Sequence, residues 1–495
     1  MKPMVPHNVV KNTIQPRSIE QIHTMKKTSK LNSTAVKLII PLLAFAACTS
    51  IAGEAITKAD NTDALNLTTS WVGDSVPTSS DIALWDSTVT GGNTTILGGD
   101  LSFAGIQATN PGGAVNIGNY SEANTLTLGA SGVDTAVGIT LATPLALSAD
   151  QTWTGSGGVT SIFQIDNGGY TLTANGGGGK VFGAYAPISG AGGYTQAGAA
   201  TLFFGANTYT GTTTINGGYI MLLDGGSLSS LSPVTGSAGT LYFNGNSQTF
   251  ANTVTGDILV TQEGAGSTVK MTGMNSYTGN TSIDVGSTLL VNGNNSGSHH
   301  DVFSGGTLGG TGTVKNLSVA AGGTLAPGGG VGTGPGTLTS SDYVIFSAGA
   351  LSSKFTLQLN TDGSGVAGTN WSKLAAAQIG FDGATSSTPI IITLQTLDGT
   401  NAPGALGSFD LSVNHEWAGF MTAGYSGGYA DNKFIVDTTG FANAFSGTFS
   451  VTNTGVGLGT ELNLIYTAVP EPSSFVMMAL GAGMMLMQVR RKRAA

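Results

Sequence analysis

Cysteine is almost absent from this chain: Cys48 is the only one among 495 residues. An intramolecular disulfide is therefore excluded, and with it the class of small folds that disulfides hold together. Charged residues are also scarce, at 9 % of the chain against about a quarter in an average protein. Because 40 % of the residues are hydrophobic, this shortage of charge does not indicate disorder, and we expect a large packed core.

Arginine is missing from the whole of residues 38–489. That range contains 7 lysines and 26 acidic residues, which gives it a formal charge of −19. The other basic residues lie within residues 1–37 and 490–493. Because so acidic a body repels phosphate backbones, we expect no nucleic-acid partner.

Glycine is abundant instead, with 77 residues, and one part of the chain occurs twice, at residues 195–226 and 261–293. Such repetition indicates supersecondary units that stack on one another. In each copy, short Thr-rich and apolar runs alternate with Gly, Asn and Asp, which supply turns. We expect a repeated turn whose asparagines bond within the fold and contact no ligand; it contains Asn207, Tyr209 and Gly211 in the first copy, and Asn275, Tyr277 and Gly279 in the second.

Thr-Leu pairs recur downstream at a regular spacing. They begin at Thr288, Thr307 and Thr324, which are separated by 19 and then 17 residues. Steps of this length suit one coil of a parallel β-helix with three short strands. Leu at a fixed position of the coil would stack in the core, and Asn and Thr at fixed positions would form hydrogen-bonding ladders along the axis. We therefore predict an all-β fold, a right-handed parallel β-helix (β-solenoid) over residues 96–346 with about 12 coils. A β-sandwich with accidental repetition is the alternative.

The run TLFFGANTYTGTTTINGGYI in the first copy resembles the autotransporter-associated β-strand repeat. Residues 304–330, which contain Gly-Gly-Thr-Leu twice, resemble the segment that commonly follows the last such repeat. The resemblance implies a secreted β-helical stalk and does not specify a ligand. The second copy departs from the pattern, because Lys270 and Met271 stand where the first copy has Phe203 and Phe204.

Residues 1–52 have the pattern of an export signal. Lysines precede an apolar stretch from Leu38 to Ala47, and small residues follow it. This stretch is too short for a retained transmembrane helix. Met25 is an alternative start. We expect Cys48 to be removed with the signal peptide, and lipidation of Cys48 is the alternative.

Two segments flank the predicted β-helix. Residues 53–95 contain Trp71 and Trp85, and we expect them to cap the first coil, whose open edge would otherwise pair with other chains. In the alternative interpretation, these tryptophans stack on sugar rings. Residues 347–467 have longer apolar runs and are expected to form a C-terminal β module or a broadened end of the β-helix, with one short helix over Ser372–Gln378.

Residues 468–495 form a tripartite tail. The tail contains Val469, Pro470, Glu471 and Pro472, then an apolar run from Phe475 to Met487, then Arg490, Arg491, Lys492 and Arg493. Prolines keep the first part extended, the apolar run suits a short transmembrane helix, and a basic cluster stays on the cytoplasmic side. The tail resembles the PEP-CTERM sorting signal of Gram-negative bacteria. The resemblance implies processing near Pro-Glu-Pro by an exosortase-type membrane transpeptidase; a permanent tail anchor is the alternative.

Residues suited to catalysis or metal binding are few. His299, His300 and Asp301 are candidate metal ligands, but adjacent histidines on a loop are more commonly solvated. Asp362 opens an Asp-Gly-Ser-Gly run with a faint likeness to a calcium loop. The chain has no Gly-x-Ser-x-Gly elbow, and its acidic residues are scattered singly. We therefore predict no enzyme activity, no metal and no cofactor.

These features together predict a non-enzymatic exported protein, structural or adhesive, at the cell surface or in the extracellular matrix. The expected route crosses the inner membrane of a Gram-negative bacterium. Expected partners are the exosortase-type enzyme, the membrane transiently, and exopolysaccharide or the cell envelope. A β-helical protein that binds or degrades polysaccharide is one alternative. An autotransporter passenger is another, which the basic tail does not favour.

Overall fold

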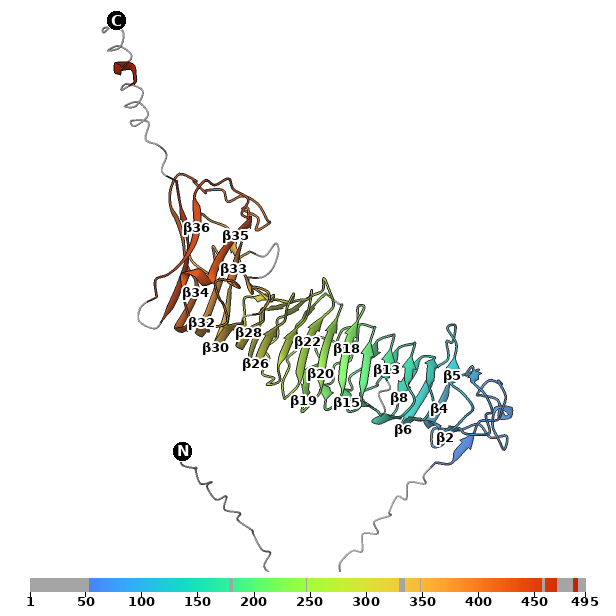
Figure 1. Ribbon diagram of the computed structural model, residues 1–495. Coiled ribbons are helices and arrows are strands. Elements are labelled where there is room, and N and C mark those ends of the chain that lie inside the picture. The colour runs from blue at the N-terminus through green and yellow to red at the C-terminus, as the bar shows by residue number, and fades with distance from the viewer. Residues whose placement is uncertain are drawn as a thin grey trace, which may run out of the picture. The chain divides into compact units, whose positions relative to one another are not determined.

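The computed structural model describes residues 53–177, 181–245, 247–328, 334–347, 349–455, 459–469 and 484–487. The predicted signal peptide, residues 1–52, lies outside the described residues. The described chain winds as a β-solenoid of about 11 turns, close to the number expected (Figure 1). The all-β class and the solenoid are thus confirmed, whereas the hand of the coil stays a prediction.

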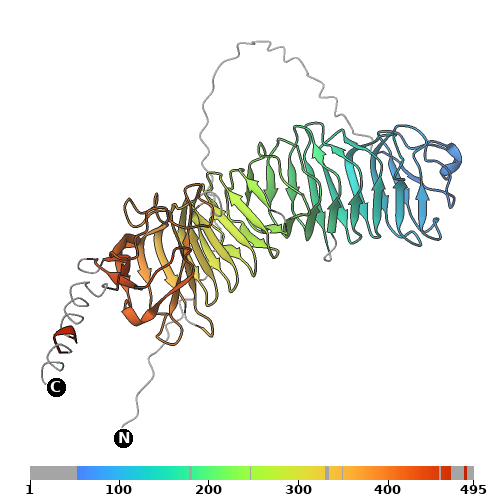
Figure 2. The same ribbon diagram turned by 90° about the horizontal axis from the view of Figure 1, so that it is seen from above.

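The strands lie side by side in three sheets that form the faces of the coil (Figure 1, Figure 2). Sheet 1 belongs to the N-terminal half and contains β1 (Ala55–Thr57), β2 (Ile82–Trp85), β4 (Leu101–Ala108), β6 (Leu126–Thr135), β9 (Gln151–Gly155), β12 (Leu172–Gly176), β15 (Tyr194–Gln196), β17 (Thr213–Ile215) and β19 (Val234–Gly236), with a branch of β8 (Leu145–Leu147), β11 (Ile165–Asp166) and β14 (Ile188–Ser189).

Sheet 2 runs along the whole stack. Its parallel strands are β3 (Asn93–Thr95), β5 (Val115–Gly118), β7 (Ile139–Ala142), β10 (Val159–Ser161), β13 (Val181–Ala184), β16 (Ala200–Phe203), β18 (Tyr219–Leu223), β20 (Thr240–Asn244), β22 (Leu259–Glu263), β24 (Thr281–Ile283), β26 (Asn294–Val302), β28 (Thr313–Val319), β30 (Thr337–Phe346), β32 (Lys373–Gly380) and β34 (His415–Gly427). Two antiparallel strands, β37 (Thr460–Thr467) and β36 (Thr448–Asn453), extend it beyond β34.

Sheet 3 belongs to the C-terminal half. It contains β21 (Gln248–Phe250), β23 (Thr268–Met271), β25 (Thr288–Val291), β27 (Thr307–Gly310), β29 (Thr324–Pro327), β31 (Lys354–Leu359), β33 (Ile390–Thr396) and β35 (Phe434–Gly440). Two short 3₁₀ turns, η1 (Thr68–Ser70) and η2 (Asp431–Lys433), and one helical turn at residues 484–487 are the other regular elements in these ranges.

The regularly spaced Thr-Leu pairs lie in register on successive coils of sheet 3. Thr288 pairs with Thr307 and Thr307 with Thr324 in sheet 3, and the following leucines pair in the same register. Leu289, Leu308 and Leu325 are fully buried. Alternation along each short strand places Leu inward and Thr outward, so the expected stack of leucines in the core is confirmed.

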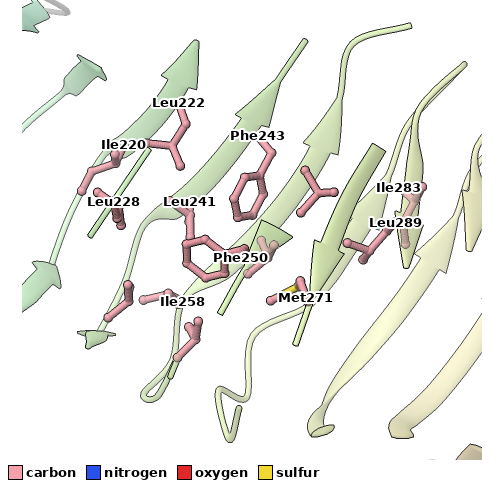
Figure 3. Close-up of a cluster of buried hydrophobic side chains, with 14 of the residues drawn as sticks. Ile220, Leu222, Leu228, Leu241, Phe243, Phe250, Ile258, Met271, Ile283 and Leu289 are labelled. Atoms are coloured by element: carbon pink, nitrogen blue, oxygen red, sulfur yellow. The ribbon is translucent and has the colours of Figure 1, made fainter. Parts of the chain in front are cut away.

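The core is a column of apolar side chains enclosed by the three faces (Figure 3). Ile220 of β18 stacks against Leu241 of β20, and Leu222 against Phe243, because these residues are paired in register on neighbouring strands. Phe243 also contacts Phe250 of the next face edge-on, with ring centroids 5.0 Å apart. Each such side chain contributes about 1.5–3 kcal/mol on burial, which replaces the stabilisation that disulfides would give.

The two sequence copies do not stack on one another. β17, in the first copy, lies in sheet 1, whereas its counterpart β24 lies in sheet 2. In the same way, β18 of sheet 2 corresponds to β25 of sheet 3. The offset of 68 residues equals three coils plus one face, so the second copy is rotated by one face around the axis. The repeated sequence therefore specifies the local conformation of a turn, and not the face of the solenoid on which that turn lies.

The segment before residue 96 packs onto the first coils. Trp71 and Trp85 are 2 % and 0 % exposed, and their rings meet edge-on at 5.8 Å. The Trp85 indole N–H donates to the Asn93 side-chain oxygen at 2.9 Å. Stacking of these tryptophans on sugar rings is therefore wrong, because no ring face is open. That residues 53–95 act as a cap stays a prediction.

Parallel pairing continues without a break past residue 346. β30 pairs with β32 and β32 with β34, while β31 and β33 continue sheet 3. The parallel sheets of the solenoid thus extend to β34 and β35, and β36 and β37 then pair antiparallel. The assignment of residues 347–467 to a C-terminal β module or to a broadened end of the β-helix stays a prediction. The helix predicted over Ser372–Gln378 is wrong: β32 forms there, because Lys373 and Leu374 align with Thr337 and Leu338 of the preceding coil.

Candidate functional site

The tail leaves the solenoid directly after its last strand. β37 ends at Thr467, and the backbone N–H of Ala468 donates to the Asn414 side-chain oxygen at 2.9 Å. Val469 is already 53 % exposed. Pro470, Glu471, Pro472 and the basic cluster Arg490, Arg491, Lys492 and Arg493 lie outside the described residues. The sequence motif therefore begins where the chain is released from the sheet.

The apolar run of the tail is described only at residues 484–487, which form one helical turn with exposed side chains. Within the described ranges, no helix is both long and apolar enough to cross a membrane. The transmembrane helix predicted over Phe475–Met487 is thus not supported by the structure.

The repeated turns contain the same buried hydroxyl network. In the first copy, the Tyr209 hydroxyl lies 2.6 Å from Thr213 Oγ1, which lies 2.8 Å from Ser232 Oγ of the next coil. Ser232 Oγ in turn donates to the Gly211 carbonyl at 2.7 Å. Burial raises the pKa of Tyr209 well above its usual value, so the phenol stays protonated and serves as a cross-link between coils.

The second copy repeats this geometry one face further round. The Tyr277 hydroxyl lies 2.7 Å from Thr281 Oγ1, which lies 2.8 Å from Ser298 Oγ, and Ser298 donates to the Gly279 carbonyl. Burial raises the pKa of Tyr277 to about 12. Both networks are closed within the fold and hold no group poised for acid–base chemistry.

The repeat asparagines join three successive coils. Asn207 Oδ1 accepts from the Ile188 N–H at 2.8 Å, while its side-chain nitrogen donates to the Ser227 carbonyl at 2.9 Å. Asn275 likewise accepts from the Val254 N–H at 2.8 Å and donates to Asn295 Oδ1 at 2.7 Å. Each buried amide therefore completes backbone hydrogen bonding where the chain turns.

The histidine pair does not lie on a solvated loop. It belongs to β26, because His300 pairs in register with Thr281 and Leu317 on the inward side of sheet 2. Burial lowers the pKa of His300 to about 3, so the ring is neutral. His299 Nε2 lies 2.9 Å from Asp301 Oδ1 and 3.1 Å from Ser318 Oγ. Because one nitrogen faces both groups, this cluster is not a Ser-His-Asp relay.

No group of three or more His, Cys, Asp or Glu side chains in the described part of the chain is placed to hold a metal. Asp362 Oδ1 instead accepts from the backbone and hydroxyl of Ser364, and these bonds lower the pKa of the carboxyl. The Asp-Gly-Ser-Gly run is thus a turn closed on itself.

One cleft on sheet 1 was not foreseen from the sequence. It measures about 590 Å³ and brings together Asp134 and Asp150, which are separated in the sequence by the two strands β7 and β8. It forms where β6 bends: the register with β4 shifts between Phe103 and Gly105, and β6 pairs with β8 before this shift and with β9 after it. Gly132, with φ of 60°, makes this bulge possible. The pairing partners of β6 are long-range, so no local signal marks the cleft.

The described fold thus places the protein in the class of β-solenoids. Comparison with known families adds one finding: residues 468–493 match the PEP-CTERM protein-sorting motif. No curated protein matches the chain. The motif indicates an exported protein of the Gram-negative cell envelope or surface, processed by exosortase, a membrane enzyme. The likeness of residues 195–226 and 261–293 to autotransporter-associated repeats stays a hypothesis.

Proposed function

We propose that this chain is a non-enzymatic structural protein of the cell surface or extracellular matrix, which supports adhesion through its solenoid. The observation that carries the proposal is the junction at Thr467–Val469, where a sorting motif follows directly on the last strand of the solenoid. Sorting therefore acts on the solenoid as its cargo. A largely apolar core and closed polar networks suit a load-resisting scaffold, since they leave few free groups for chemistry.

The tail would act in three steps. The signal peptide starts export, and the apolar run from Phe475 to Met487 halts the last residues in the membrane. Arg490 to Arg493 then stay inside by the positive-inside bias. The run has about 13 residues, roughly 20 Å as a helix, so flanking residues or local thinning must make up the difference from a ~30 Å hydrocarbon core. Pro-Glu-Pro would then lie just outside, extended and open to the transpeptidase.

Replacement of Pro470, Glu471 and Pro472 by alanine tests this order of events. We expect export to continue but release to fail, so that the protein stays in the inner-membrane fraction. The matched control replaces the neighbouring Ser473 and Ser474 by alanine, and we expect it to fractionate as the wild type. Equal release of all three forms would contradict recognition of Pro-Glu-Pro.

Charge reversal at the other end of the tail tests the halt. Conversion of Arg490, Arg491, Lys492 and Arg493 to glutamate removes the positive-inside signal. We expect less protein paused at the inner membrane and less processed product, measured by fractionation and immunoblotting. Unchanged processing would mean that the basic cluster has no part in sorting.

A further inference from the structure

The cleft on sheet 1 lies beside the bulge of β6, where the strands of successive coils approach closely. Ile82 pairs with Gly105, and Gly105 pairs with Gly132 in the next coil. Thr152 of the following coil lies beside Gly132, because a Cβ on Gly132 would lie 2.2 Å from the Thr152 carbonyl oxygen. At both glycines the backbone of the neighbouring coil occupies the position where a Cβ would lie, so the strands approach closely between Ile82 on one side and Thr152 on the other. A hollow of about 590 Å³ is within the usual range for ligand sites.

The lining offers hydrogen bonds without positive charge. Asp134 Oδ1 accepts from the Thr154 hydroxyl at 3.0 Å, and Asp150 Oδ1 accepts from the Thr171 N–H at 2.7 Å. Among the described residues, the second oxygen of each carboxylate has no hydrogen-bond partner. The half-exposed Ile82 adds apolar surface beside them. Such a mixture suits a ligand that carries hydroxyl donors and C–H faces together.

We propose that this cleft binds a segment of a neutral polysaccharide. An anionic polymer would meet two carboxylates and an acidic body, and none of the residues that line the cleft is basic. A peptide strand would need free backbone groups at a sheet edge, but β9 is paired with β6 on one side and β12 on the other. Only side chains therefore face the ligand, and their carboxylate, amide and hydroxyl groups can exchange hydrogen bonds with sugar hydroxyls.

A row of hydroxyls leads away from the cleft along the axis. Thr152 pairs with Thr173, which begins an outward ladder that continues through Thr195, Thr214, Thr235 and Thr255. All six side chains are exposed or half-exposed, and successive coils are spaced by about 4.8 Å. The ladder extends the cleft into a track, so the ligand is a polymer laid along the solenoid and not a single sugar.

Affinity electrophoresis of the full chain, in gels that contain a polysaccharide, tests the assignment. The neutral probes are hydroxyethylcellulose, laminarin and dextran, and the anionic probes are alginate and polygalacturonate. We expect at least one neutral polymer to retard the wild type and both anionic ones to leave it unretarded. Retardation by an anionic polymer alone, or only with added Ca²⁺, would overturn the neutral assignment, as would no retardation by any neutral probe.

A steric variant locates the site. Ala130 lines the cleft and is exposed, so Ala130→Trp should fill the hollow and weaken retardation by about tenfold. Ala251→Trp places the same side chain at an exposed alanine outside the cleft and should bind as the wild type. Circular dichroism confirms that both variants fold. Equal binding by Ala130→Trp and the wild type would overturn the site.

This inference goes beyond the proposed structural role and is independent of the tail. The processing of the Pro-Glu-Pro variants does not depend on the cleft, so failure of glycan binding leaves the sorting mechanism standing. Failure of processing likewise leaves the binding assay interpretable, because residues 82–173 lie far from the tail in the sequence.

Discussion

At the scale of single residues, the chain uses polar side chains where a globular protein would use loops and disulfides. Tyr209 and Tyr277 pass hydrogen bonds from one coil to the next, and the repeat asparagines do the same for the backbone. These groups are buried, so removing one would leave its buried hydrogen-bond partner without a donor or acceptor, and this loss would lower stability.

Asn275→Ala should lower stability by about 1–3 kcal/mol, because the buried N–H of Val254 would lose its acceptor. Asn216→Ala is the matched control, since Asn216 is exposed and should cost little. The denaturant midpoints of the two variants measure the difference. A midpoint for Asn275→Ala equal to that of the control would contradict a structural role for the repeat asparagine.

His300 makes stability depend on pH. Its pKa is about 3 in the fold against 6.5 for a free histidine, so the unfolded state binds the proton more readily. The stabilising contribution is therefore complete above pH 6.5 and is lost as the pH falls toward 3. His300→Gln should unfold with less dependence on pH across this window. Denaturant unfolding of the two proteins across this pH range checks the expectation, and equal slopes for His300→Gln and the wild type would contradict it.

At the scale of strands and turns, the spacing of sequence motifs predicted the length of a coil, but it predicted only part of the strand register. The Thr-Leu steps predicted the ladder of sheet 3, because one coil has nearly constant length there. The repeated turn did not predict that the copies lie on different faces, since this depends on the lengths of the intervening coils. The helix assigned to Ser372–Gln378 and the loop assigned to His299–Asp301 were wrong because tertiary pairing overrode local propensity.

Close approach of backbones between coils explains the glycines of the repeated turn. A Cβ on Gly279 would lie 2.1 Å from the carbonyl oxygen of Ile258 in the coil before it. Gly279→Ala should therefore cost about 1–3 kcal/mol through forced backbone shifts. Gly138→Ala has open space around the new methyl group and should be close to neutral. Thermal unfolding of the two variants provides the comparison, and an unaffected Gly279→Ala would rule out this contact.

At the scale of the whole molecule, an acidic β-solenoid without internal disulfides is coupled to a sorting tail. From the acidic composition we expected no nucleic-acid partner. The tail could be recognised from the sequence because Pro-Glu-Pro, an apolar run and a basic cluster follow one another in that order. The cleft beside Asp134 could not be recognised from the sequence, because it forms only after folding, where a bulge in β6 meets the strands of neighbouring coils.

Mass spectrometry of protein recovered from the cell surface tests the sorting mechanism most directly. We predict that its most C-terminal peptide ends near Pro470–Pro472, and that no peptide from Ser473 onward is recovered. Intact peptides that run from Ser473 through the apolar run to Met487, found in surface-located protein, would contradict processing and identify the tail as a permanent anchor.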